Sequence, residues 1–79
     1  MPNLTSKLAE KLIAWRVEVG RREGLQHPLS QAEASRRIGI ARQTLIEIEN
    51  GTRIPAHKDV IRAIFDVTGL SPADWWEAA

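Results

Sequence analysis

The stretch LSQAEASRRIGIARQTLIEIENG, residues 29–51, contains two short amphipathic patterns with a glycine between them. Ala34 and Ile38 lie on one side of the first pattern, which ends at Gly39. The second pattern starts only two residues later. Two helices joined by so short a turn must cross steeply, which is the helix-turn-helix arrangement. The stretch therefore predicts that geometry over approximately residues 30–50, with a plain helical hairpin as the alternative.

A capping pattern marks the start of the first helix of this pair. Ser30 is followed three residues later by Glu33, the spacing of a capping box. We expect the Ser30 hydroxyl to accept from the Glu33 amide, and the Glu33 carboxylate to reach back to the Ser30 amide.

The second helix of the pair has two sides of different chemistry. At 100° per residue, Leu45 and Ile48 share one side, which we expect to be buried. Arginine and glutamine can make bidentate contacts with guanine and adenine edges in the major groove, and an exposed isoleucine can meet a thymine methyl. The alternative is that the arginine and glutamine are simply good helix formers at exposed positions. The opposite, outward side carries Arg42, Gln43, Ile46, Glu47 and Asn50.

The rest of the chain also shows helical patterns. An apolar stripe of Leu4, Leu8, Leu12, Trp15 and Val19 predicts a long first helix, capped near Gly24. A connector over residues 26–28 follows, since Pro28 disfavours helix for the residue before it.

Two more helices are expected after Gly51. Pro55 suits the first turn of a fourth helix, which Gly69 would end. Ser71 and Pro72 would begin a fifth, with Leu70 and Trp75 spaced as a hydrophobic staple. The apolar side of the fourth helix would comprise Val60, Ile61, Ile64, Phe65 and Val67.

Size and composition limit the function classes. The chain has 79 residues, 43% hydrophobic, and we expect one domain over residues 1–79. There is no cysteine, and two separate histidines form no metal or catalytic constellation, so we expect no metal, no cofactor and no enzyme activity. No run is long enough to span a bilayer, and no signal-peptide block is evident, so we expect a cytoplasmic, nucleoid-associated protein.

The overall charge alone does not indicate a nucleic-acid partner. The net charge is +1, and residues 30–58 contain five bases and three acids, a local charge of +2. On charge alone, a solvated surface of mixed sign is the simpler interpretation.

Residues 29–55 resemble the Cro and phage-repressor-like (lambda-repressor-like) helix-turn-helix family. The resemblance implies an all-α, compact five-helix bundle in which helices 2 and 3 form the helix-turn-helix, and it extends more loosely to Pro72. The Glu-Asn-Gly ending at this spacing is its most specific part. The matching positions are Leu29, Ser30, Gln31, Ile38, Gly39, Ile40, Thr44, Leu45, Ile48, Glu49, Asn50 and Gly51.

The resemblance implies a role for each matching position on double-stranded DNA. Phosphate contacts fix the register of such a protein, whereas contacts with base edges select the sequence. Glu49 would form a partly buried ion pair, for which Arg16 is the candidate partner. The implied base-reading positions are Arg42, Gln43 and Glu47, with Ile46 beside them, and the implied phosphate-binding positions are Gln31, Thr44, Asn50, Thr52 and Arg53, of which Arg53 could also reach a base.

The sequence departs from the family pattern at several positions. Ala41 stands where a capping serine or threonine is usual, which should cost the recognition helix about 1 kcal/mol. Ala34 replaces a core leucine, and Trp15 is large enough to fill the space. Residues 25–28 look like an insertion that could disturb the Arg16 assignment. Glu47 could accept from cytosine or act by repelling unsuitable sites.

These observations predict a sequence-specific transcriptional regulator. The simplest mechanism is repression through occupation of a pseudo-palindromic operator by a homodimer, with the C-terminal residues 70–79, and Trp76 in particular, as the candidate dimer contact. The alternative for Trp76 is that it covers the first or fourth helix from outside. The alternative function is a protein-binding module, such as an antitoxin that binds a toxin or an adaptor.

Overall fold

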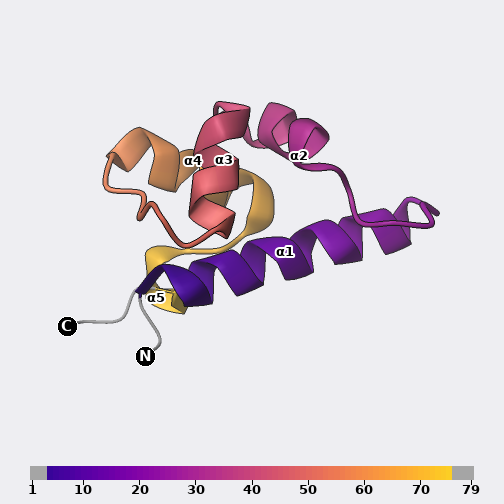
Figure 1. Cartoon of the computed structure of the whole chain (residues 1–79), viewed down its shortest axis with the longest axis horizontal. Helices are drawn as coiled ribbons and strands as arrows, with labels where there is room; N and C mark the ends of the chain where they lie inside the picture. The colour runs from indigo at the N-terminus through magenta and orange to yellow at the C-terminus, as the bar shows by residue number, and fades with distance from the viewer. Residues whose placement is uncertain (1–3, 76–79) are drawn as a thin grey trace.

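The computed structural model describes residues 4–75, and these residues form five helices without a strand (Figure 1). The all-α prediction is therefore confirmed. The helices are α1 (Leu4–Arg22), α2 (Gln31–Ile38), α3 (Arg42–Glu49), α4 (Lys58–Thr68) and α5 (Pro72–Trp75).

The long helix α1 supports the rest of the fold. Helix α3 packs against both α1 and α2, while α4 packs against α2. The short α5 returns to contact α1, and Figure 1 shows it beside the N-terminal end of that helix. The two short helices of the helix-turn-helix therefore rest on α1 and α4, which fix their crossing.

One cluster of apolar side chains fills the space between the helices. Its members lie on the apolar sides of the helices, except Leu29, which comes from the connector before α2, and full burial of a large aliphatic side chain is worth about 1.5–3 kcal/mol. Trp15 lies partly buried against the same cluster, as does Ile40 from the turn. The buried members are Leu8, Leu12, Val19, Leu29, Ala34, Ile38, Leu45, Ile48, Ile64 and Trp75.

Helix α2 begins with half of the predicted capping box. The Glu33 amide donates to the Ser30 hydroxyl at 3.1 Å, as expected. The prediction that the Glu33 carboxylate accepts from the Ser30 amide is wrong. This carboxylate instead accepts from Arg36 and Arg37 on the same helix. Those charged donors offer stronger hydrogen bonds than a neutral amide.

The connector between α1 and α2 folds back against α1. The Leu29 amide donates to the Arg16 carbonyl at 3.0 Å. Gly20 makes this approach possible, since a Cβ atom there would lie 2.4 Å from the carbonyl oxygen of His27. The additional residues 25–28 are thus accommodated as a loop, and Arg16 keeps its place.

The prediction for the start of α4 is wrong. The helix begins at Lys58, and its N-cap is His57, whose Nδ1 accepts from the Asp59 amide at 3.2 Å. Pro55 is buried in the loop before the helix. Its fixed φ suits a first helical turn, but the same φ also suits an extended approach to the core.

The apolar side of α4 is only partly covered. Ile64 is fully buried, and Val60 and Ile61 pack partly against the core. In contrast, Phe65 is 48% exposed and Val67 is 39% exposed. Part of this helix therefore presents apolar surface to solvent.

Helix α5 begins as predicted and anchors the end of the described chain. The Ser71 amide donates to the Asp74 carboxylate at 2.8 Å, and this bond, followed by one from the Ser71 hydroxyl, lowers the pKa of Asp74. Leu70 packs against the core, and Trp75 is 1% exposed, so both residues of the predicted staple join the same apolar cluster, whereas their direct contact stays a prediction. Trp76 lies outside the described residues.

Within residues 4–75, no helix combines the length and apolar character needed to cross a bilayer. In the same part of the chain, no group of three or more histidine, aspartate or glutamate side chains is arranged to hold a metal ion.

Candidate nucleic-acid interface

The two sides of α3 are sorted as the sequence predicts. Leu45 and Ile48 are completely buried, whereas Arg42 and Gln43 are exposed at the N-terminal end. Ile46 and Glu47 are half-buried on the outward side. The helix therefore presents guanidinium, amide, carboxylate and apolar groups together on one surface.

The ends of α3 differ in how they are capped. Ala41 is the N-cap, in an extended conformation (φ −64°, ψ 142°), and provides no side-chain hydrogen bond, as predicted. Asn50 is the C-cap and is exposed. The N-terminal amides of the helix therefore lack a side-chain acceptor at the cap, and a phosphate is one group that could take that place.

An ion pair joins α1 to the C-terminal end of α3. The Arg16 guanidinium makes a bidentate contact with Glu49, at 2.9 Å from Nε and 2.7 Å from Nη2. Its Nη1 donates to the Leu29 carbonyl at 2.9 Å. The two side chains are 15% and 3% exposed, respectively, so the predicted pair is confirmed and is largely shielded from water.

Gln31 belongs to the same cluster. Its Nε2 donates to Glu49 at 2.9 Å, which fixes the side chain at the N-terminal end of α2. A primary amide carries two N–H groups, so the contact leaves one for another acceptor. The assignment of Gln31 to a phosphate is compatible with this geometry and remains a prediction.

A second set of polar contacts lies on the outward side of α3 and was not foreseen from the sequence. Glu47 accepts from Arg53 Nε at 2.7 Å and from Gln43 Nε2 at 3.3 Å. The Glu47 carbonyl also accepts from the amide and hydroxyl of Thr52, at 3.0 and 3.1 Å. Four predicted DNA-contacting residues are thus linked to one another; we call Gln43, Glu47 and Arg53 the Glu47 triad.

The charges of the triad are balanced locally. The Arg53 guanidinium, and after it the Gln43 amide, hold the pKa of Glu47 below its usual range. Glu47 is therefore ionised at neutral pH. Its negative charge lies on the surface that is expected to bind DNA, which is itself a polyanion.

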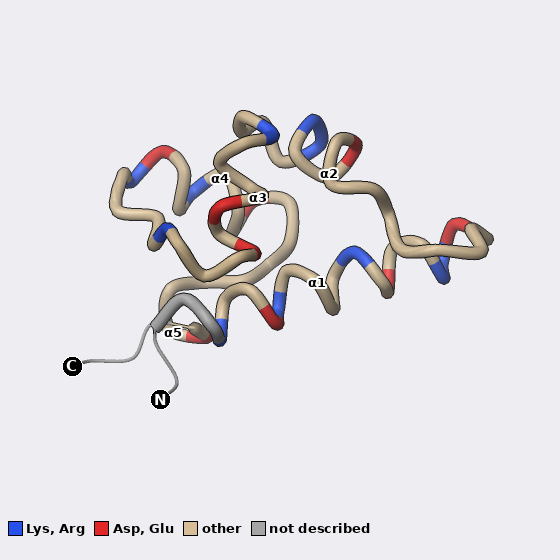
Figure 2. Tube along the Cα trace, viewed as in Figure 1, with Lys and Arg blue, Asp and Glu red and all other residues tan. Residues whose placement is uncertain are grey.

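The basic residues around the helix-turn-helix are mostly paired with acids. Figure 2 shows Lys and Arg interspersed with Asp and Glu along the described chain. Arg37 contacts both Glu23 and Glu33, and Arg36 contacts Glu33. Arg42 differs from them, because no ion pair joins it to any of the residues that the structure describes.

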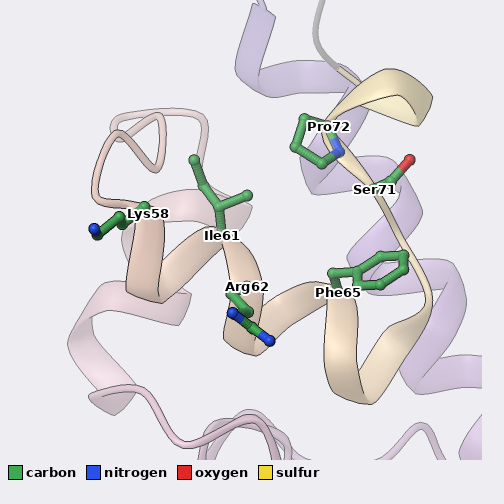
Figure 3. Close-up of a pocket in the computed structure, with 6 residues that line it drawn as sticks. All are labelled: Lys58, Ile61, Arg62, Phe65, Ser71 and Pro72. Atoms are coloured by element: carbon green, nitrogen blue, oxygen red, sulfur yellow. The ribbon is translucent and has the colours of Figure 1, made fainter.

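A groove opens on another face of the molecule, between α4 and the start of α5. It has a volume of about 310 Å³ and an apolar lining. Figure 3 shows the Ile61 and Phe65 side chains on the side of α4 that faces Pro72. The residues that line it are Lys58, Ile61, Arg62, Phe65, Ser71 and Pro72.

Comparison with known proteins gives one match. A family model described as "Helix-turn-helix" matches residues 21–75, which is more than half of the chain. No curated protein and no solved structure matches the sequence.

Proposed function

Since the chain belongs to the Cro- and phage-repressor-like helix-turn-helix family and is a DNA-binding domain of the transcription-regulator type, we propose that it is a sequence-specific repressor that binds a pseudo-palindromic operator as a homodimer. The repressor role and the dimer are the parts of this proposal that require experiment. We also place the protein in the cytoplasm, on the nucleoid, because that is where the proposed ligand lies.

The outward face of α3 is the observation that carries the proposal. Arg42 and Gln43 are exposed at its N-terminal end, next to the half-buried Ile46 and Glu47. A helix inserted into the major groove presents its N-terminal side chains to base edges. We assign base reading to Arg42, Gln43, Ile46 and Glu47.

The residues around this face would hold the DNA backbone. Gln31 lies at the N-terminal end of α2, where it contacts Glu49, and the neighbouring Asn50 is exposed as the C-cap of α3, so both lie near the C-terminal end of the recognition helix. Contacts with backbone phosphates would fix the depth and register of this helix in the groove. We assign phosphate binding to Gln31, Thr44, Asn50, Thr52 and Arg53.

The groove between α4 and α5 supports the homodimer. It combines an exposed phenylalanine with an apolar lining, and such surfaces on small proteins commonly mark interfaces. Trp76, the dimer contact expected from the sequence, lies outside the described residues and remains part of this proposal. A homodimer on a pseudo-palindrome with half-sites one helical turn apart would hold its two recognition helices about 34 Å apart.

The same groove is the reason to keep a second candidate function. An apolar surface of this kind could instead receive a different protein, as it would in an antitoxin that binds a toxin or in an adaptor. That function and DNA binding are compatible with each other.

Selection of bound sites from a random duplex pool at a stated salt concentration tests the proposal. We expect a two-fold symmetric motif with half-sites about one helical turn apart. A motif without symmetry would contradict the homodimer. Absence of any enriched sequence would contradict specific DNA binding and favour the protein-binding function, which co-purification of a tagged copy with a defined partner would then examine.

A further inference from the structure

We propose that Glu47 reads no base itself, and that it is a positioning residue that holds Arg53 and Gln43 for DNA and withholds Arg53 from indiscriminate phosphate contacts. This inference rests on the proposed function, because it concerns how the same interface selects its sequence. It replaces the assignment of Glu47 as a cytosine acceptor with a role that acts through two neighbours, and it moves Arg53 from phosphate binding to a base edge.

The geometry of the Glu47 triad carries the inference. The two carboxylate oxygens are divided between two donors, since Oε1 accepts from Arg53 and Oε2 accepts from Gln43. The Arg53 contact, at 2.7 Å, is a charge-assisted hydrogen bond, whereas the Gln43 contact is longer, at 3.3 Å, and weaker. Arg53 is therefore the main residue that Glu47 controls.

The backbone strengthens this control. The Thr52 amide and hydroxyl both donate to the Glu47 carbonyl, so the loop that carries Arg53 is fastened to the same residue of α3. Gly51 reverses the chain at φ +78°, a conformation that glycine adopts without strain. Main-chain and side-chain contacts thus hold Arg53 against the recognition helix, although it lies six positions after Glu47 in the sequence.

The held side chains keep the donors that base reading requires. Arg53 uses Nε for Glu47, which leaves the N–H groups of its two terminal nitrogens for a guanine edge. Gln43 uses one N–H, which leaves its carbonyl oxygen and second N–H for an adenine edge. Orientation by a carboxylate reduces the conformations that each side chain must give up on binding.

The charge of Glu47 has a second effect. With its carboxylate close to the Arg53 guanidinium, the pair contributes little net positive charge to the interface. A protein that neutralises fewer phosphates binds random DNA less tightly and with a weaker dependence on salt. Glu47 therefore lowers non-specific binding and raises the ratio of specific to non-specific affinity.

Glu47→Gln is the appropriate variant, because it keeps the size of the side chain and removes its charge. We expect affinity for random duplex to rise roughly threefold or more, and the slope of log affinity against log salt to steepen by about 0.9, the value for one additional phosphate contact. The selected motif should lose preference together at the base pairs read by Arg53 and Gln43.

A double-mutant cycle with Arg53→Ala separates this role from direct reading. If Glu47 acts through Arg53, Glu47→Gln should leave the salt slope almost unchanged in the Arg53→Ala background. Glu10→Gln removes the same charge from an exposed position on α1 and serves as the matched control. Its salt slope and motif should equal those of the wild type.

Several results would overturn the inference. Loss of preference at a single C·G pair in Glu47→Gln, with all other positions retained, would make Glu47 a base reader. If the changes in salt slope caused by Glu47→Gln and Arg53→Ala simply add in the double mutant, Glu47 does not act through Arg53. Failure of the wild type to enrich any sequence would instead overturn the proposed function.

A measurement without DNA tests the contact itself. The Arg53 Nε–H resonance of the free protein should be shifted and protected from solvent exchange, and both properties should be much reduced in Glu47→Gln, whose neutral amide oxygen is a weaker acceptor. An unchanged resonance would contradict the positioning role whatever the DNA experiments show.

Discussion

At Arg16 and Glu49, a single pair of side chains connects three parts of the chain. Arg16 also donates to the Leu29 carbonyl, and Glu49 also accepts from Gln31. Loss of either member would leave a charge that is shielded from water with too few partners. Such a loss is far more costly than loss of an exposed ion pair.

We predict that Arg16→Ala lowers the free energy of unfolding by about 3 kcal/mol, because the remaining Glu49 carboxylate is 3% exposed. Urea denaturation would measure the change. Arg21→Ala is the matched control, since Arg21 is 74% exposed in its pair with Glu18 and should matter by less than about 1 kcal/mol. Equal losses of unfolding free energy in the two variants would contradict the claim that burial makes the Arg16–Glu49 pair more important.

Base-reading and phosphate-binding residues should differ in how they respond to DNA sequence. We predict that Arg42→Ala weakens binding to the preferred site by about 1–3 kcal/mol and relaxes preference at one base pair. Asn50→Ala should weaken binding evenly on preferred and random duplexes. Fluorescence anisotropy measures the affinity of each variant for the preferred and the random duplex. An even loss for Arg42→Ala would refute its base-reading assignment.

At the scale of the elements, the N-terminus of α3 can be improved. Ala41 already has the extended backbone of an N-cap and lacks only the acceptor. We predict that Ala41→Ser raises the free energy of unfolding by about 1 kcal/mol. Ser30→Ala is the complementary control: it removes an existing cap from α2 and should lower the free energy of unfolding by a similar amount. Thermal unfolding of both variants gives the comparison.

The contact between α1 and its connector depends on Gly20. Alanine normally favours a helix over glycine by about 1 kcal/mol. Here its Cβ would lie 2.4 Å from the His27 carbonyl oxygen, a backbone atom that cannot move alone. We therefore predict that Gly20→Ala destabilises the protein by about 1–3 kcal/mol, as overpacking does. A gain in stability on urea denaturation would show that the connector yields easily.

The elements also show what can be predicted from a sequence. The existence of all five helices follows from apolar periodicity, glycine positions and capping signals, the last of which alone predict α5, and the Arg16–Glu49 pair follows from the family pattern. The start of α4 does not, because the preference of Pro55 for a first turn is local and its burial is decided by tertiary packing. Periodicity also defines the apolar side of α4, but it does not show which of these side chains the other helices bury.

The contacts of the candidate interface were predicted less completely. The two sides of α3 follow from the helical period. The link between Glu47 and Arg53 does not, because these residues are joined across a loop whose direction is set by Gly51. From the sequence alone, the Glu47 carboxylate is therefore interpreted as a base reader or a repelling charge, and only the three-dimensional structure identifies Arg53 as its partner.

At the scale of the whole molecule, the exposed apolar face of α4 and α5 should govern assembly. We predict that Phe65→Lys shifts the proposed dimer towards monomer and weakens operator binding at least tenfold, because one half-site alone holds the protein poorly. Sedimentation at several concentrations measures the first effect. Folding should persist, since Phe65 is 48% exposed.

Matched variants identify which apolar surface matters. Ile13→Lys introduces the same charge at a side chain of α1 that is 41% exposed, and it should leave association unchanged. Trp76→Ala should weaken association in the same direction as Phe65→Lys. Wild-type sedimentation as a monomer at all concentrations would contradict the homodimer altogether.

The division of labour on α3 also bears on how the specificity of such a protein could be redesigned or could diverge. The buried side, with Leu45, Ile48 and Glu49, belongs to the supporting frame and must be kept. Arg42 can be exchanged by itself, because no described ion pair connects it to its surroundings. Residues 43, 47 and 53 should instead change as a unit, so that retargeting one position alone would leave the other two aimed at the former sequence.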